Sequence, residues 1–327
     1  TFTSDIYLSK KKNMLFPLKI PPIAGTGTSG SVVLNVGDMQ NKGIEFALGW
    51  RDKVGEVNYR VSATYARNVN EITRMAGTNK RSPLGSVSTG NSTDDITFLC
   101  EGMEAGAFLM MPTNGIANTD AKLAEYQKLR PDAKLGDLVY VDRNKDGLLN
   151  DDDRIFCGSG APEAEIGFNA GLDWKGFDFS MNWYASIGNE IVNGSKVASY
   201  QHNVNRDMLY QWSLDNPTST IPSYRTTSHF NARTYADIWV EDGSFLRLKN
   251  IVLGYALPKH IVRKCGLTKL RFYLAADNLL TLTKYDGYDP EVGNDGLSTR
   301  GLDMGTYPIA VQMLSLIHIS EPTRLLS

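Results

Sequence analysis

The chain has 327 residues, of which 42% are hydrophobic and 21% are charged, and its formal net charge is −2. So small a net charge argues against electrostatic binding of nucleic acid, and no apolar run reaches the roughly 18 residues of a transmembrane helix. Composition does not exclude a transmembrane β-barrel, because its strands are half polar. The chain begins without Met, inside a predicted strand. We therefore expect it to be a fragment, in which a missing signal peptide says nothing about secretion.

Alternation of apolar and polar side chains, which is typical of a β-strand between two different environments, recurs along the chain. The predicted strands cover residues 2–8, 43–51, 56–67, the two arms of a hairpin at 164–187, 244–257, 268–280, and a last strand from about Tyr307. The strand at 244–257 has mixed faces, so a β-bulge is expected to shift its register. Two helices are predicted inside long links, at 119–129 and 205–214.

The hairpin at 164–187 has the clearest pattern. Apolar side chains from Ile166 to Trp174 and from Phe177 to Ile187 share one face, polar and small residues share the other, and Lys175-Gly176 forms the turn. Soluble strands are usually about five or six residues long. The longer arms here match the roughly ten residues with which a tilted barrel strand crosses a bilayer.

Short and long links between the predicted strands alternate. The short links are at 51–56, 175–176 and 258–267, and the long ones are at 10–42, 68–164, 188–243 and 281–306. Membrane barrels place short turns at the periplasmic end and long loops at the extracellular end. Aromatic residues near strand ends fit an interfacial girdle, or are ordinary sheet aromatics: Trp50, Tyr59, Tyr65, Trp174, Trp183 and Tyr255.

These patterns predict an all-β chain that forms a transmembrane antiparallel β-barrel with long extracellular loops. Two alternatives remain open, a secreted calcium-stabilised β-sandwich adhesin and a small stand-alone barrel. Aromatic residues in the long links either stack on the faces of sugars or pack the loops together: Tyr200, Tyr210, Trp212, Tyr224 and Trp239.

Residues 142–153 match the spacing of a calcium-binding loop. Oxygen-bearing side chains alternate, Gly147 stands sixth and permits the sharp turn, and an acid stands twelfth. The predicted ligands are Asp142, Asn144, Asp146, Leu148 through its backbone carbonyl, Asn150 and Asp153. The preceding LVYVD looks extended, so this is a calcium loop without an EF-hand, in a structural role. The alternative is an acidic turn that binds no metal.

Other chemical motifs are missing. The four histidines are scattered, and no nucleophile lies beside a base, so we predict that the chain is not an enzyme: His202, His229, His260 and His318. The three cysteines lack metal-ligand spacing. Cys100 and Cys157 share one long link and either form a disulfide or, with Cys265, remain free thiols.

Several motifs, in order, resemble the C-terminal barrel region of the SusC/RagA family of TonB-linked outer-membrane importers. They are NVGDMQNKGIE at 35–45, Gly136-Asp137 leading into 142–147, GFN at 167–169, WKGFD at 174–178, GSFLRLKNI at 243–251, DNL at 277–279 and Lys284-Tyr285. The resemblance implies that the chain supplies about eight strands of a 22-stranded barrel.

The resemblance also implies partners and a function. Family members carry an N-terminal plug and a TonB-contacting segment, pair with a SusD-like surface lipoprotein, and import oligosaccharides or peptides across the outer membrane. We therefore expect residues 1–310 to be the C-terminal part of such a barrel, in contact with outer-membrane lipid. Residues 311–327 depart from the family pattern and look like translated adapter read-through, so we expect a non-native tail that forms no strand.

Overall fold

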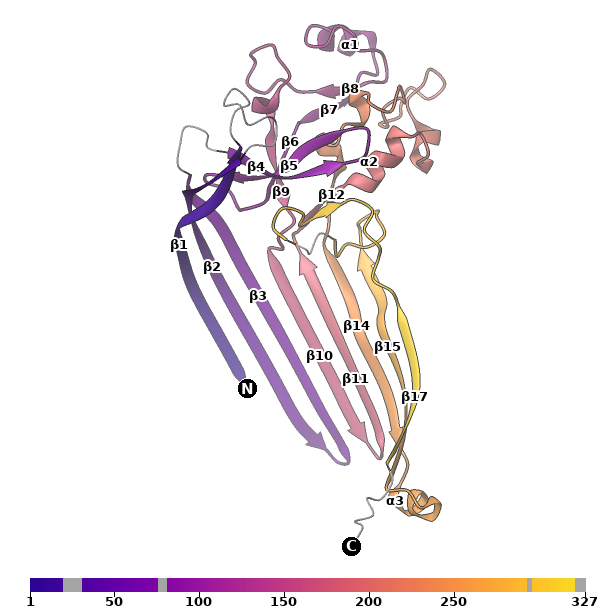
Figure 1. Cartoon of the computed structure of the whole chain (residues 1–327). Coiled ribbons are helices and arrows are strands. Elements are labelled where there is room, and N and C mark those ends of the chain that lie inside the picture. Colours follow the sequence, from indigo (N-terminus) through magenta and orange to yellow (C-terminus); the bar gives the residue numbers. More distant parts are fainter. Residues whose placement is uncertain (20–30, 76–80, 293–295, 321–327) are drawn as a thin grey trace.

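The computed structural model describes all residues except 20–30, 76–80, 293–295 and 321–327. Among the described residues, eight long strands form one antiparallel sheet in the order β1-β2-β3-β10-β11-β14-β15-β17. Their bounds are β1 Phe2–Lys19, β2 Ser31–Val54, β3 Val57–Met75, β10 Ala164–Trp174, β11 Phe177–Ile187, β14 Phe245–Ala256, β15 Lys269–Thr283 and β17 Gln312–Ser320. Figure 1 shows these strands as a tilted wall, with the long connections folded together beyond one end and the short ones at the other. The predicted all-β class is confirmed, and seven of the predicted strands lie where they were expected, whereas the last begins at Gln312 rather than near Tyr307.

The first strands are longer than the alternating stretches that predicted them. β1 continues to Lys19 and β2 begins at Ser31, so the link expected at 10–42 was drawn too long. The ladder runs on through polar pairs such as Ser9 with Asn41. Backbone hydrogen bonds need no apolar face. Alternation therefore marks only the part of these strands that lies between two environments.

The hairpin of β10 and β11 has the predicted register. Ile166 pairs with Ala185 and Phe168 with Trp183. Lys175 and Gly176 both have positive φ, 48° and 91°, which is the backbone of a two-residue hairpin turn. A Cβ on Gly176 would also stand 2.6 Å from the carbonyl oxygen of Ala256, so the turn and the neighbouring strand both require glycine. The bulge predicted in β14 is present, between Leu248 and Asn250.

The large sheet has one apolar and one polar face. A row across five strands is apolar: Tyr59, Leu172, Phe179, Leu253 and Leu274. The adjacent row is mainly polar: Asn58, Asp173, Asp178, Gly254 and Tyr273. Leu253 and Leu274 are 50% and 58% exposed although they lie mid-strand. An exposed apolar face of this extent is unfavourable in water and favourable in lipid.

Of the six aromatic residues predicted near strand ends, four lie close to the short links, namely Trp50, Tyr59, Trp174 and Tyr255, whereas Tyr65 and Trp183 lie within their strands. Trp174 stacks on Phe177, which packs against Tyr255, with ring centroids 6.2 and 4.4 Å apart. The Trp50 indole donates to the Tyr59 hydroxyl at 3.3 Å. These rings have an apolar body and a polar tip, which suits an interface between lipid and water.

The long connections form a second body with its own core. It contains a four-stranded sheet of β4 Arg81–Ser88, β5 Thr93–Cys100, β6 Ala107–Met110 and β9 Ile155–Ser159, a three-stranded sheet of β12 Glu190–Asn193, β13 Val240–Asp242 and β16 Leu302–Asp303, and the pair β7 Thr113–Ile116 and β8 Leu138–Tyr140. One hydrophobic cluster joins Val87, Trp239 and Leu302. The loops therefore fold together as one loop assembly.

Helices are short. They are α1 Asp120–Tyr126, α2 Gly194–Gln201 and α3 Lys259–Val262, with 3-10 turns η2 Asp151–Asp153, η3 Arg206–Tyr210, η4 Phe230–Ala232, η5 Asp237–Trp239 and η6 Arg263–Cys265. The helix predicted at 119–129 is α1, capped by Thr119, whereas the one predicted at 205–214 is only η3. Within the described part of the chain, no helix is long and apolar enough to cross a membrane.

The expectation that no strand follows residue 310 was wrong. Gln312–Ser320 forms β17 and pairs antiparallel with β15 from Lys269 to Asp277. An edge strand needs one partner ladder and no strict alternation, and Pro322, which cannot donate, lies beyond its end. The non-native origin of residues 311–327 stays a prediction.

Neither alternative architecture fits the described residues. A β-sandwich places its long strands in two facing sheets, whereas here they form one sheet. A stand-alone eight-stranded barrel needs β1 to pair with β17, and the described strands form no such pair. The sheet is therefore open at both edges.

Candidate functional site

The residues predicted as calcium ligands lie in one tight loop that follows β8 and ends in η2. The Asp142 carboxylate accepts the backbone N–H groups of Lys145 and Gly147 at 2.7 and 2.8 Å. Asp146 accepts from the Leu148 amide at 2.8 Å, and Asn144 accepts from the Asp146 amide at 3.0 Å. Gly147 has a φ of 84°, as the sharp turn required.

Asp153 closes this loop. Its side chain is fully buried and accepts the amides of Arg143, Asn144 and Asn150 at 2.8, 3.3 and 3.0 Å, while the Asn150 side chain caps η2. The carboxylates thus satisfy backbone donors. Among the described residues, no three His, Cys, Asp or Glu side chains converge as a metal-binding group. The predicted curl is present, and calcium binding stays a prediction.

Arg154, which the sequence reasoning missed, ties the acidic loop to the loop assembly. Its buried guanidinium donates to the Asp151 carboxylate at 2.9 Å and to the carbonyls of Asp95 and Leu109 at 2.5 and 2.9 Å. It also lies 5.5 Å from the centroid of the Phe98 ring. Its position directly after three acids gave no sign of these distant partners.

Most of the loop aromatics are packing residues. Tyr200, Trp212 and Trp239 are buried in the core of the loop assembly, and Tyr224 packs against it. Tyr210 alone of the five is largely exposed, at 59%. Sugar stacking by the buried members is therefore excluded, and Tyr210 remains available to a ligand.

The Gly136-Asp137 motif has a structural role. The buried Asp137 carboxylate accepts from Arg225 at 2.9 Å and from Asn231 at 3.0 Å. A Cβ on Gly136 would lie 2.2 Å from the Ser223 hydroxyl, so the chain can pass here only as glycine. The motif therefore joins two distant parts of the loop assembly.

Cys100 and Cys157 are free thiols. They lie on β5 and β9, which are separated by β6 in the same sheet. Two strand spacings of roughly 4.8 Å place their backbones farther apart than a disulfide spans. Burial raises the pKa of each thiol to about 11. The free-thiol alternative therefore holds for this pair.

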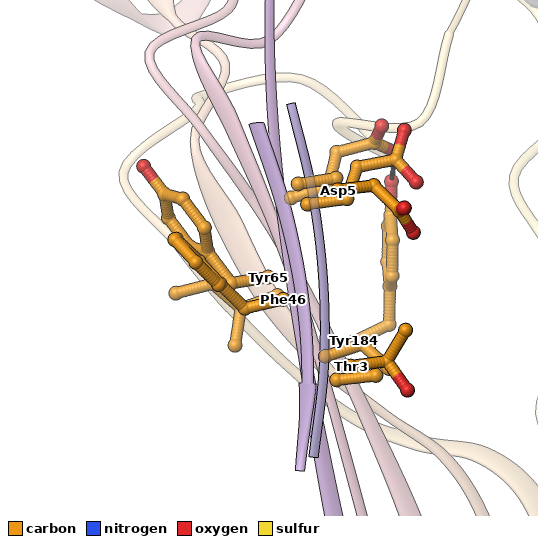
Figure 2. A pocket seen from close by; sticks show the side chains of 12 residues that line it. Thr3, Asp5, Phe46, Tyr65 and Tyr184 are labelled. Carbon is orange, nitrogen blue, oxygen red and sulfur yellow. Dashed lines mark hydrogen bonds between the residues drawn. The ribbon is translucent and has the colours of Figure 1, made fainter. Parts of the chain in front are cut away.

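The polar face of the large sheet carries charged and hydrogen-bonding groups. Figure 2 shows Thr3, Asp5 and Tyr184 on one side of the strands, and Phe46 and Tyr65 on the other. The polar side lines a cavity of about 840 Å³ lower on the sheet, between β2, β3, β10, β11 and β14. Hydrophilic groups of this kind suit an aqueous interior.

The link from β15 to β17, residues 284–311 and here called the strap, returns to this polar face. Arg247 on β14 is buried and donates to Asp289 at 2.6 Å, to Glu291 at 2.8 Å and to Thr281 at 2.9 Å. Farther along, the Thr97 hydroxyl donates to the carbonyl of Ser298 at 2.9 Å, and β16 pairs with β12. The strap is therefore held by both the wall and the loop assembly.

A wide antiparallel sheet with one apolar face, one polar face and folded loops beyond one end defines the wall of a membrane β-barrel. The chain is 30% identical over 318 residues to TonB-dependent receptor P3 of Formosa agariphila, which covers 93% of this chain and 30% of that protein. It is 25% identical over 315 residues to TonB-dependent receptor SusC of Bacteroides thetaiotaomicron, with 95% and 29% covered.

Solved structures agree. The structure of the RagAB peptide transporter matches with a TM-score of 0.74 and 25% identity, over 98% of this chain and 33% of that chain. No protein-family model matches. The chain spans about a third of the length of the proteins it matches. The predicted resemblance is confirmed: the chain is similar to TonB-dependent receptors of the SusC/RagA kind, and it has the fold of a barrel wall.

Proposed function

We propose that the protein carrying this chain is an outer-membrane importer of nutrient oligomers in a Gram-negative bacterium. It is driven through TonB and works with a SusD-like surface lipoprotein. The observation that carries the proposal is the two-faced sheet, apolar toward lipid and polar toward an aqueous interior, in a chain similar to TonB-dependent receptors. The role is transport, and the site residues bind rather than catalyse.

The cargo is an oligosaccharide or a peptide. SusC is named a TonB-dependent receptor, and RagAB is described as a peptide transporter. The loop assembly lies beyond the end of the large sheet that carries the long links (Figure 1), so in this proposal cargo passes it on the way in. The acidic loop at 142–153 binds calcium in a structural role that stiffens this entrance, supported by its backbone curl and by the exposed carboxylate of Asp146.

Deletion of the whole gene in its own bacterium tests the proposal. The mutant is expected to lose growth on pooled oligosaccharides or on pooled peptides as sole carbon source, and loss of TonB should give the same defect. Growth on monosaccharides and free amino acids is the control and should not change. A tagged receptor should fractionate with the outer membrane. Normal growth on both pools, or a receptor outside the membrane fraction, would contradict the proposal.

A further inference from the structure

A cavity of about 320 Å³ lies where the polar face of the sheet meets the strap. Its lining includes Asn41, Glu45, Asn68, Glu165 and Arg300. A second cavity of about 190 Å³ shares Glu165 and Arg300 with it. The two cavities therefore adjoin at Glu165 of the wall and Arg300 of the strap, and Glu104 of the loop assembly adds a further carboxylate to the larger one.

The backbone at Arg300 is fixed. A Cβ on Gly160 would lie 2.4 Å from the Arg300 carbonyl oxygen, so the strap is pressed directly against the chain at Gly160. The next residue, Gly301, accepts the Val192 amide at 2.8 Å, and Leu302 then pairs with β12. The guanidinium therefore starts from a rigid base.

The carboxylates on the opposite wall come from neighbouring strands of the large sheet. Glu45, Ala66 and Glu165 are neighbours in one row across β2, β3 and β10. The small side chain of Ala66 leaves room between the two acids. The Tyr184 hydroxyl donates to Glu165 at 2.5 Å and holds one carboxylate oxygen, which leaves the other for a ligand.

The two signs of charge face one cavity without neutralising each other. In the described part of the chain, no ion pair within 4.0 Å involves Glu45, Glu165 or Arg300. A guanidinium binds a carboxylate through two parallel hydrogen bonds, and a carboxylate binds an ammonium group through charge-assisted ones. A ligand that carries both charges could therefore bind Arg300 of the strap through its anionic group and Glu45 or Glu165 of the large sheet through its cationic group.

We infer that this cavity is a cargo subsite for a zwitterionic, peptide-like group, whose carboxylate binds Arg300 and whose ammonium group binds Glu45 and Glu165. The inference rests on the proposed import function and names its cargo class. A neutral sugar could bond to the amides of Asn41 and Asn68, but it would leave the charged groups without opposite charges. Charges of both signs in one cavity therefore favour the zwitterion, because it can form a charge-assisted hydrogen bond with each wall.

The test uses the complete receptor that contains this chain, purified in detergent. Calorimetry compares the tetrapeptide Gly-Ala-Ala-Gly with free ends, the same peptide acetylated at its N-terminus or amidated at its C-terminus, and maltotetraose. Each block is expected to weaken binding about tenfold, the size of one charge-assisted contact. Arg300→Gln should abolish the effect of the amide block, and Glu45→Gln should reduce the effect of the acetyl block.

Arg263→Gln, on the short link between β14 and β15, is the matched control and should change nothing. Neither Arg300 nor Glu45 has a described ion-pair partner, so the variants should keep wild-type thermal unfolding. Equal binding of free and blocked peptides, an Arg300→Gln receptor that still discriminates, or binding of maltotetraose without peptide would overturn the inference. Uptake by cells is measured in parallel. If the wild-type receptor imports oligomers but does not discriminate between free and blocked peptides, only the inference is refuted. If the wild-type receptor imports no oligomer of either class, the proposed function is refuted.

Discussion

Replacing Arg247 by Met should release the strap from the barrel wall. The guanidinium is 3% exposed and contacts two carboxylates, and its partner Asp289 is only 7% exposed. Removing one member of a buried ion pair leaves an uncompensated charge, which costs about 3–5 kcal/mol. Glu291 retains Lys249 at 2.7 Å, so the loss falls mainly on Asp289.

Asp289 also sets the pH range of this effect. Burial opposes its ionisation, but the Glu291 amide, Arg247 and the Ile309 amide outweigh burial, so its pKa lies below the usual 3.8. Because the pKa of Asp289 is lower in the folded protein than in the unfolded chain, its ionised form stabilises the fold fully at pH values above the unfolded pKa. This stabilisation is lost as the pH falls through the folded pKa. The difference between wild type and Arg247→Met should therefore be complete at neutral pH and shrink below about pH 4.

Hydrogen exchange in the complete receptor measures the release. A local loss of about 3–5 kcal/mol speeds exchange of the strap amides by roughly two to four orders of magnitude. Arg271→Met is the matched control, because Arg271 pairs with Asp178 on the same sheet but both side chains are about a quarter to a third exposed. Such a pair contributes about 0–1 kcal/mol. Strap exchange no faster in Arg247→Met than in this control would refute the reasoning.

Three further outcomes are expected. Trp239→Ala removes a buried ring and its bond to the Arg233 carbonyl, at about 3–5 kcal/mol, so limited proteolysis should cut the loops and spare the wall. Alkylation of Cys100 and Cys157 at pH 8 should be about a hundredfold slower than for a thiol of ordinary pKa, because burial raises each pKa to about 11; rapid labelling would contradict this burial. Calcium should protect residues 142–153 from proteolysis, and Asp142→Ala should abolish that protection. Equal cleavage with and without calcium would show that this segment is an acidic turn that binds no metal.

The wall was predictable because one rule operates along it. A strand between lipid and water must alternate, so the hairpin at 164–187 gave its faces, its register and its turn from the sequence alone. Alternation is not required where both faces of a strand are in water. The parts of β1 and β2 beyond the alternating residues were therefore not predicted from the sequence. β17 was not predicted because it is held by backbone pairing with β15, which leaves no pattern of side chains in the sequence.

The loop assembly was not predictable in the same way. Its sheets join short strands whose partners are far apart, such as β12 with β16, and a strand of two to four residues has no detectable period. The acidic loop was found because its contacts are local, within twelve residues. Arg247 and Arg300 were missed because their significance depends on a strap that returns from distant sequence.

The strap connects two parts of the molecule that are stabilised in different ways, the wall by backbone pairing and the loop assembly by a hydrophobic core. The wall is held by its backbone ladders and has little core of its own, whereas the loop assembly has a core that joins Val87 to Leu302. The strap belongs to both, because Asp289 binds the wall through Arg247 and β16 binds the loops through β12. A ligand between Glu165 and Arg300 would contact both bodies at once. The proposed cargo subsite therefore lies where the wall and the loop assembly can be coupled. If it binds cargo, Arg247→Met should weaken that binding although Arg247 does not line the cavity.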